Sequence, residues 1–258
     1  LHLSLRRQRQ MCIRDRMCFK IIIPARYSSR RLPGKPLKDL GGKTMIERVY
    51  LLAKYSNAEE VYIATDNKEI FDCCNSFGAK TIMTSSDHLS GTDRIGEVID
   101  TLELNSDELI VNLQGDEHNI DPDSNEKVIN CLKRAISKGI MVSTGYIPEA
   151  TIDQLDDPSV GHLLPSLVET VITISRYPLP YPMAEKMHRT VHVGLYAFTR
   201  AALLNYSSWK RGPIERAESI EIMRFLEHGE SIACVPVASG SIGVDTPEDL
   251  EKAKILIK

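Results

Sequence analysis

The sequence has no long apolar run and no excess of positive charge. None of its uninterrupted hydrophobic stretches reaches the ~18 residues that a membrane-spanning helix needs, so no membrane association is expected. Across 258 residues, 35 acidic side chains against 32 basic ones give a formal net charge of −3. Nonspecific nucleic-acid binding normally requires a basic surface, so we expect no nucleic-acid partner either.

Cysteines are few, and their spacing matches no structural motif. The six cysteines include no C-x-x-C pair, which argues against both a zinc site and a disulfide framework. A reducing cytoplasm fits this composition best. Residues 1–16, LHLSLRRQRQMCIRDR, open on Leu and lack the apolar core of a secretory signal. We therefore expect them to be a non-native leader, with the native start at Met17.

Strand and helix patterns alternate along the first part of residues 17–258, which we expect to form a single domain. Short apolar runs predict strands at 19–23, 61–65, 80–84, 108–113 and 140–146. Apolar residues at helical spacing predict helices at 44–55, 68–78, 92–102 and 124–137. This alternation predicts an α/β fold with a mostly parallel sheet flanked by helices.

The second half of the chain is less regular. Strands are predicted in 169–175, at 191–199 and at 231–237, with a final helix over 246–257. A small lobe is expected around 159–212. Residues 213–229 predict one long helix, in which Glu215, Glu218 and Glu221 recur every three residues. Such a row usually forms a solvated face, although it could accept sugar hydroxyls if it lined a cleft.

The most unusual segment is IIIPARYSSRRLPGKPL, residues 21–37. Directly after a predicted strand it carries four cations between three prolines: Arg26, Arg30, Arg31 and Lys35. Proline fixes φ and lowers the entropy lost when a loop is ordered. Arginine binds phosphate oxygens with a two-pronged fork, and lysine adds a point charge. The pattern favours a preformed polyphosphate site over a solvated basic loop.

Two further segments, 85–94 and 114–117, also follow predicted strands, and ligands bind beyond the carboxyl ends of such strands. Asp116 is a candidate for Mg²⁺, which takes few protein oxygens plus substrate phosphates, or a plain turn residue. Asp245 is either a helix cap or a second carboxylate for the same ion. GGKT at 41–44 fails the P-loop pattern because Leu37 stands where that pattern requires glycine.

Taken together, these segments resemble the 3-deoxy-manno-octulosonate cytidylyltransferase (CMP-Kdo synthetase) family over residues 19–258. The resemblance is carried by residues 21–37 and by ATD (64–66), SGTDR (90–94), NLQGDE (112–117), HVGLYAF (192–198) and GVDTPEDL (243–250). It implies a Rossmann-like fold of the nucleotide-diphospho-sugar transferase type, with a smaller lobe that supports a homodimer. It also implies transfer of CMP from CTP to the anomeric hydroxyl of the acidic sugar Kdo, with Mg²⁺, for lipopolysaccharide biosynthesis.

The resemblance further implies roles for individual side chains. Catalytic roles would fall to Arg26, Lys35, Asp116 and Asp245. Nucleotide binding would fall to Ala25, Arg26, Arg31, Lys35, Ser90, Arg94 and Gln114, the arginines and Lys35 holding the triphosphate. The acidic sugar would face Arg176, His192 and Glu221. Asp116 and Asp245 would ligate magnesium.

The chain departs from the family pattern at His118, at Gly161–His162 and at Ile222, where many members carry a glutamine beside the sugar. The Ile222 change keeps open a cytidylyltransferase for another acidic sugar, such as 8-amino-Kdo or a nonulosonate. The changes at His118 and 161–162 keep open a non-catalytic nucleotide-binding module.

Overall fold

The computed structural model describes residues 18–29, 32–106, 108–181, 183–184, 188–238, 244 and 246–256. The expected leader at 1–16 lies outside these residues, and so do Arg30, Arg31 and Asp245. Within the described part of the chain, no helix is long and apolar enough to cross a membrane.

The first part of the chain forms the predicted strands and helices in the predicted order. The strands are β1 (Phe19–Ala25), β2 (Glu60–Thr65), β3 (Lys80–Met83) and β4 (Leu109–Leu113). The helices are η1 (Lys35–Leu37), α2 (Met45–Lys54), α3 (Lys68–Ser76), α4 (Gly91–Thr101) and α5 (Asp123–Ile136). Hydroxyl N-caps start two of them, because Thr44 accepts the N–H of Glu47 and Ser90 accepts that of Asp93.

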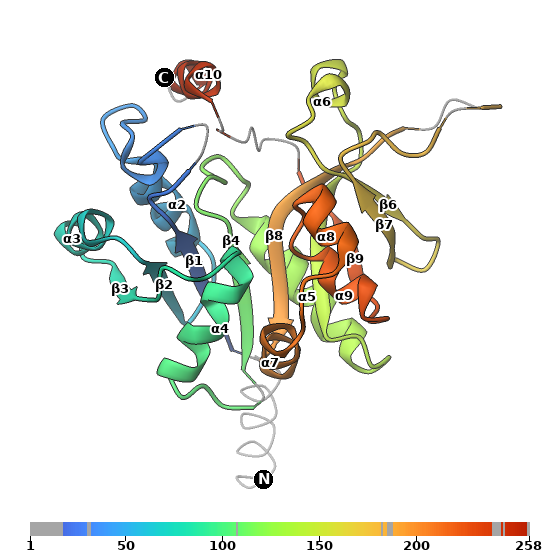
Figure 1. Cartoon of the computed structure of the whole chain (residues 1–258), viewed down its shortest axis with the longest axis horizontal. Helices are drawn as coiled ribbons and strands as arrows, with labels where there is room; N and C mark the ends of the chain where they lie inside the picture. Colours follow the sequence, from blue (N-terminus) through green and yellow to red (C-terminus); the bar gives the residue numbers. More distant parts are fainter. Residues whose placement is uncertain are drawn as a thin grey trace, which may run out of the picture.

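A seven-stranded sheet with the order β3-β2-β1-β4-β8-β5-β9 forms the centre of the molecule (Figure 1). The additional strands are β5 (Val142–Ile147), β8 (Val191–Thr199) and β9 (Ala233–Pro236). Strand β8 pairs antiparallel with β4 and β5, and the other pairs in the sheet are parallel. The predicted mostly parallel α/β architecture is therefore confirmed.

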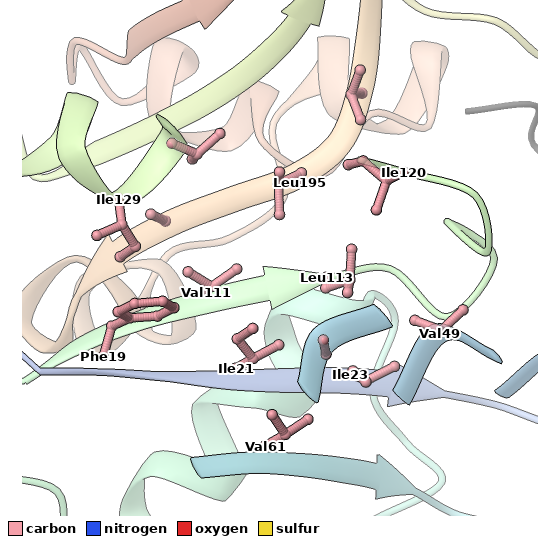
Figure 2. Close-up of a cluster of buried hydrophobic side chains, with 14 of the residues drawn as sticks. Phe19, Ile21, Ile23, Val49, Val61, Val111, Leu113, Ile120, Ile129 and Leu195 are labelled. Carbon is pink, nitrogen blue, oxygen red and sulfur yellow. The ribbon is translucent and has the colours of Figure 1, made fainter. Parts of the chain in front are cut away.

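Apolar side chains cover both faces of this sheet, as near-continuous hydrophobic strands require. On one face, Ile21 and Ile23 of β1 pack with Val49 of α2, Ile70 of α3 and Ile129 of α5. Figure 2 shows part of this cluster, with side chains of neighbouring strands meeting over the sheet. On the other face, Ile22 packs in a cluster with residues of α4, α7 (Arg200–Ser208) and α9 (Met223–Glu227).

The range 159–212, expected to form a small lobe, is divided between two layers. Strands β6 (His162–Pro165) and β7 (Val171–Ser175) pair as a separate two-stranded sheet, which projects beside β8 and β9 in Figure 1. The remaining elements of this range, β8 and α7, belong to the central layers. A short helix, α6 (Ile152–Asp156), precedes the range.

The prediction of one helix over 213–229 was wrong. The chain forms α8 (Pro213–Glu218), turns at Ser219 with a left-handed φ of 53°, and resumes as α9. The predicted solvated row of glutamates is therefore broken, and Glu215 is fully buried against Arg224 at 2.8 Å. The final helix, α10 (Pro247–Leu256), begins as predicted, with Thr246 accepting the N–H of Asp249.

The order of the strands locates a crevice. From β1 the chain proceeds through β2 and β3 to one edge of the sheet, whereas β4 lies on the other side of β1. Ligands of open α/β sheets bind where the order reverses in this way, beyond the carboxyl ends of the strands. The ends of β1 and β4 carry the segments 24–36 and 114–117 that the sequence singled out.

Candidate active site

The end of β1, residues 88–90 of the loop between β3 and α4, and the start of α4 border a cavity of about 530 Å³. Its lining includes the predicted nucleotide residues Ala25, Arg26, Ser90, Arg94 and Gln114. Four arginines line it, at positions 26, 94, 176 and 211, against the two carboxylates of Glu215 and Glu221. We call it the cationic cavity, and its charge suits an anionic ligand.

A second cavity, of about 570 Å³, lies along β8 and is closed by residues of α6 and α10. Its lining includes six carboxylates but only two cations, Arg176 and Lys252. The carboxylates are Asp116, Glu117, Asp153, Asp157, Glu221 and Asp249. We call it the acidic cavity.

The two cavities share a wall made of Gln114, Arg176, Ser219 and Glu221. Two ligands bound in the two cavities would therefore meet at this wall. Ala25, Arg26, Ser90 and Arg94 of the predicted nucleotide residues line only the cationic cavity, whereas Lys35 does not line it. Of the predicted sugar residues, Arg176 and Glu221 belong to the shared wall and His192 lines only the acidic cavity.

The loop after β1 meets the end of β4 through an ion pair. Lys35 Nζ donates to Asp116 Oδ2 at 2.6 Å, and both side chains are mostly buried. Burial by itself would raise the pKa of Asp116, but the ammonium group of Lys35 outweighs it and lowers that pKa. Asp116 is therefore ionised at neutral pH. Arg26, on the same loop, is exposed beside the cationic cavity.

Gly115 allows β1 and β4 to end this close together. A Cβ at position 115 would lie 2.9 Å from the carbonyl oxygen of Pro24, which is closer than real Cβ atoms approach backbone. Any other residue would push the two strand ends apart. The glycine therefore sets the position of Asp116 relative to the basic loop.

The carboxylate of Asp116 is the type of ligand that suits a magnesium ion. Mg²⁺ prefers carboxylate oxygens and takes most other ligands from phosphates and water, so one or two carboxylates suffice. Among the described residues, no group of three or more His, Cys, Asp or Glu side chains is arranged as a metal site. Asp249 lines the same cavity as Asp116, which brings the start of α10 to that cavity.

Ser90 and Arg94 are both engaged within the protein. Ser90 Oγ donates to Asp93 Oδ2 at 2.7 Å as part of the α4 cap. Arg94 is 2% exposed and pairs with Asp66 at 2.7 Å, with further bonds to Thr84 and the carbonyl of Ser85. The two residues thus shape the wall of the cationic cavity, and Asp66 partly offsets the charge of Arg94.

Arg176 lies at the shared wall, where its backbone N–H donates to the carboxylate of Glu218 at 2.7 Å. Its guanidinium donates to the backbone carbonyls of Ser159, Glu218 and Ser219, which fix the side chain without neutralising it. His192 lines the acidic cavity, and its ring stacks on Tyr196 with centroids 5.5 Å apart. Burial lowers the pKa of His192 to about 3, so the imidazole is neutral at physiological pH.

Sequence reasoning missed several residues of the two cavities. Tyr196 lines the acidic cavity, and alternation along β8 could have placed it on the face of His192. Arg211 lines the cationic cavity from the loop before α8 and pairs with Glu215 at 2.9 Å. The position of Arg211 depends on the break between α8 and α9 at Ser219. No local pattern of residues indicates that break.

Comparison with known proteins identifies the family. Residues 20–232 match the sequence profile of a family described as cytidylyltransferase. The chain belongs to the cytidylyltransferase family. A relative named 3-deoxy-manno-octulosonate cytidylyltransferase, from Idiomarina loihiensis, is 37% identical over 93% of this chain and 98% of its own length. A relative from Shewanella sp. strain ANA-3, named 8-amino-3,8-dideoxy-manno-octulosonate cytidylyltransferase, is 39% identical over 91% of this chain and 96% of its own.

Solved structures agree with this assignment. The structure of CMP:2-keto-3-deoxy-manno-octonic acid synthetase complexed with CTP is 39% identical, with a TM-score of 0.85, over 93% of this chain and 98% of that one. A 4-diphosphocytidyl-2C-methyl-D-erythritol synthase from Anaerococcus prevotii, at 13% identity and a TM-score of 0.62, shares the fold. The resemblance found in the sequence is confirmed. This cytidylyltransferase is an enzyme rather than a non-catalytic nucleotide-binding module.

Proposed function

We propose that this cytidylyltransferase transfers CMP from CTP to the anomeric hydroxyl of 3-deoxy-D-manno-octulosonate, releasing pyrophosphate, for lipopolysaccharide biosynthesis. One observation carries the proposal: a cationic cavity at the switch point of the sheet meets a second cavity across the wall of Gln114, Arg176, Ser219 and Glu221. CTP would occupy the first cavity, and the sugar would occupy the second.

Arg26, Arg31 and Lys35 would hold the triphosphate. Arg26 borders the cationic cavity, and Lys35 lies at the end of β4 beside Asp116. Arginine and lysine pair well with phosphate oxygens, and a loop with prolines at 24, 33 and 36 needs little reorganisation to receive them. Ala25, Ser90, Arg94 and Gln114 would surround the nucleoside.

Arg176, His192 and Glu221 would receive the acidic sugar. The guanidinium of Arg176, which donates to backbone carbonyls among the described residues, would bind the sugar carboxylate. With a pKa of about 3, His192 is too weak a base to collect a proton at neutral pH, so we assign it a hydrogen bond to the sugar.

The reaction needs little covalent chemistry from the protein. The anomeric hydroxyl loses its proton to solvent and its oxygen bonds to the α-phosphorus, while the bond from that phosphorus to the bridging oxygen of pyrophosphate breaks. The two cavities place the reacting groups on either side of one wall, which lowers the entropic part of the barrier. Cations fixed on the loop after β1 stabilise the charge that builds up on the departing pyrophosphate.

We also propose that Asp116 and Asp245 hold Mg²⁺. Bound magnesium supplies Lewis-acid polarisation of the phosphate oxygens. Asp116 is ionised, and its neighbour Lys35 can transfer from the carboxylate to a phosphate when nucleotide enters.

A coupled assay tests the function. The chain is mixed with CTP, Mg²⁺ and each of Kdo, 8-amino-Kdo and a nonulosonate, and pyrophosphate release and the mass of the CMP-sugar are measured. Preferred turnover of Kdo is expected. Preference for another sugar would refute Kdo as the substrate, and no turnover of any of them would refute the proposal as a whole.

One observation favours 8-amino-Kdo as a second candidate. The acidic cavity has six carboxylates against two cations, and this excess attracts the ammonium group that distinguishes 8-amino-Kdo from Kdo. A relative named for this substrate is 39% identical to the chain. The ratio of kcat/KM for the two sugars decides between them.

The proposed setting is a cytoplasmic homodimer. Cys73, Cys74, Cys131 and Cys234 are free thiols in the described part of the chain, as a reducing compartment would leave them. The sheet of β6 and β7 exposes apolar side chains, including Ile172 of β7, which supports an interface there.

A further inference from the structure

The carboxylate of Glu221 connects two segments of the shared wall. Its Oε2 accepts the backbone N–H of Thr92, in the first turn of α4, at 3.0 Å. Its Oε1 accepts from Nε2 of Gln114, just beyond β4, at 2.6 Å. A longer contact of 3.5 Å comes from Nδ2 of Asn112. Glu221 thus holds the start of α4 and the end of β4 in one arrangement.

These contacts decide which way the amide of Gln114 faces. Both carboxylate oxygens of Glu221 already accept from other groups, the N–H of Thr92 and Nδ2 of Asn112, so Gln114 turns its NH₂ group toward an accepting oxygen. The oxygen of Asn112 supports the same orientation, at 3.3 Å from Nε2 of Gln114. The amide oxygen of Gln114 is left facing elsewhere, and in the described part of the chain no hydrogen bond reaches it.

Glycines on two sides leave the amide group its space beside the cationic cavity. A Cβ at Gly91 would lie 3.1 Å from Nε2 and 3.2 Å from Oε1 of Gln114, and 2.9 Å from Cγ of Pro24. A Cβ at Gly194 would lie 2.9 Å from Cγ of Gln114. Gly91 and Pro24 both line the cationic cavity. The polar end of Gln114 therefore packs against the walls of the proposed nucleotide site.

We propose that Glu221 is a positioning residue for nucleotide recognition: it fixes the amide of Gln114 so that Oε1 accepts a hydrogen bond from a nucleoside donor. The inference rests on the proposed function. It gives Glu221 a second role, in nucleotide binding, in addition to the proposed contact with the sugar. Two groups of CTP offer the required donor, namely the amino group of cytosine and the hydroxyl groups of ribose. An accepting oxygen favours cytosine over uracil, which carries an acceptor in place of that amino group.

Glu221→Gln tests the orientation with almost no change in shape. The N–H of Thr92 cannot reverse, so the new amide at position 221 would have to turn its oxygen toward Thr92 and its NH₂ toward Gln114. Two donor groups would then face each other unless Gln114 reversed its amide. Reversal would turn Oε1 away from the cationic cavity, and without reversal the repulsion of the two donor groups would displace the amide from its fixed position.

Binding of CTP to the full chain is measured by calorimetric titration with Mg²⁺ and no sugar, and again with UTP, 2′-deoxy-CTP and 3′-deoxy-CTP. In Glu221→Gln we expect CTP to bind about tenfold more weakly, the loss expected for one buried hydrogen bond. A reduced preference for CTP over UTP would assign the donor to cytosine. A reduced penalty for a deoxy analogue would assign it to ribose.

The exchange variant Gln114→Glu with Glu221→Gln provides the rescue. There the NH₂ of residue 221 faces a carboxylate at 114, which again presents an accepting oxygen to the cavity without changing the net charge. We expect CTP binding to recover relative to Glu221→Gln alone. Glu227→Gln is the matched control, because Glu227 also accepts backbone N–H groups at a helix start, those of Ile214 and Glu215. It should leave the CTP-to-UTP ratio unchanged.

Unchanged CTP affinity in Glu221→Gln, with a higher KM for the sugar, would overturn the inference and leave Glu221 a sugar contact alone. A loss of CTP affinity in Glu221→Gln that the exchange variant does not recover would also contradict the inference. These results are separate from a failure of the proposed function, because the titrations need no sugar and no turnover.

Discussion

Lys35 and Asp116 bring opposite charges together at the ends of β1 and β4. The ammonium keeps the carboxylate ionised despite burial, which is the state that a cation or a phosphate-bound metal requires. In the proposed site the two side chains would separate when substrate binds, and the cost of burying each charge would already be met by the folded protein.

Asp116→Asn should reduce turnover by at least about a hundredfold, the usual cost of removing a group that stabilises charge in the transition state. Pyrophosphate release at saturating CTP and sugar measures it. Asp72→Asn, an exposed member of a helical ion pair with Lys68, is the control and should retain full activity. Near-normal turnover with a correctly folded Asp116→Asn would contradict the proposed metal-binding role of Asp116.

Arg26→Ala should raise the KM for CTP several-fold and change the KM for the sugar less. Its side chain is exposed beside the cationic cavity, so water screens part of the loss. The same ranking is expected for Arg31→Ala. Initial rates with one substrate varied at a time give both constants, and a larger effect on the sugar would argue against a triphosphate role for this loop.

Residues of the strand ends could be predicted from the sequence, whereas residues brought in by later segments could not. Gln114 and Asp116 follow a strongly apolar strand, so the carboxyl end of the sheet is an unambiguous place for them. Arg211 and the orientation of Glu221 depend on how residues 209–222 fold back over α4, and no local pattern encodes that contact.

Helices α8 and α9 show where periodicity misleads. Residues 213–229 have strong helical spacing, yet the chain breaks at Ser219. Arg224, 2% exposed, binds both Glu215 and Asp93 through its guanidinium, each at 2.8 Å. Removing one partner of such a buried pair would leave an uncompensated charge, so this tertiary contact outweighs the local preference for a continuous helix.

Strand β6 carries a buried histidine that should make the fold sensitive to acid. His162 is 0% exposed, its Nδ1 donates to the carbonyl of Thr190 at 3.0 Å, and within the described chain its Nε2 has no hydrogen-bond partner. Burial lowers the pKa of His162, and Arg189 and Arg176 lower it further. The neutral imidazole is the form that the folded protein accommodates.

The sign of the effect follows from the direction of this shift. The unfolded chain has a histidine pKa of about 6.5, so below that pH it binds a proton that the folded chain does not bind. The contribution of His162 to the free energy of unfolding is therefore complete above pH 6.5 and falls as pH decreases. Burial lowers the pKa of His118 and His192 as well, and both act in the same direction.

His162→Asn should remove one of these contributions, because asparagine can still donate to Thr190 but does not titrate. Between pH 6.5 and the folded pKa, its free energy of unfolding should fall less steeply than that of the wild type, by up to about 1.4 kcal/mol per pH unit. Urea unfolding at half-unit steps from pH 8 to 5 measures this. Parallel curves for the two proteins over the whole range would contradict the assignment.

For the molecule as a whole, the sequence predicts a parallel sheet flanked by helices but does not predict the order of the strands in that sheet. Alternating strands and helices predicted the parallel sheet, because βαβ connections leave few alternatives. Strand β8 lies between β4 and β5 and runs antiparallel to both, and its residues pair with β4 residues that are 82 to 90 positions earlier in the chain. The spacing of residues in the sequence does not indicate this pairing. That pairing places His192 and Tyr196 beside the switch point and so creates the second cavity.

Association of two copies is the remaining prediction. The sheet of β6 and β7 and the residues around it expose Leu167, Val168 and Ile172 by 104%, 69% and 58%, a concentration of apolar surface that marks an interaction site. Val168→Asp with Ile172→Asp should shift a dimer to monomer, because each buried carboxylate would lack a partner. Sedimentation velocity over a series of protein concentrations measures the shift. Ile255→Asp, at a 71% exposed site on α10, is the control and should leave the dimer intact. A wild-type chain that stays monomeric throughout, or a double variant that dimerises as the wild type does, would place the interface elsewhere or remove it.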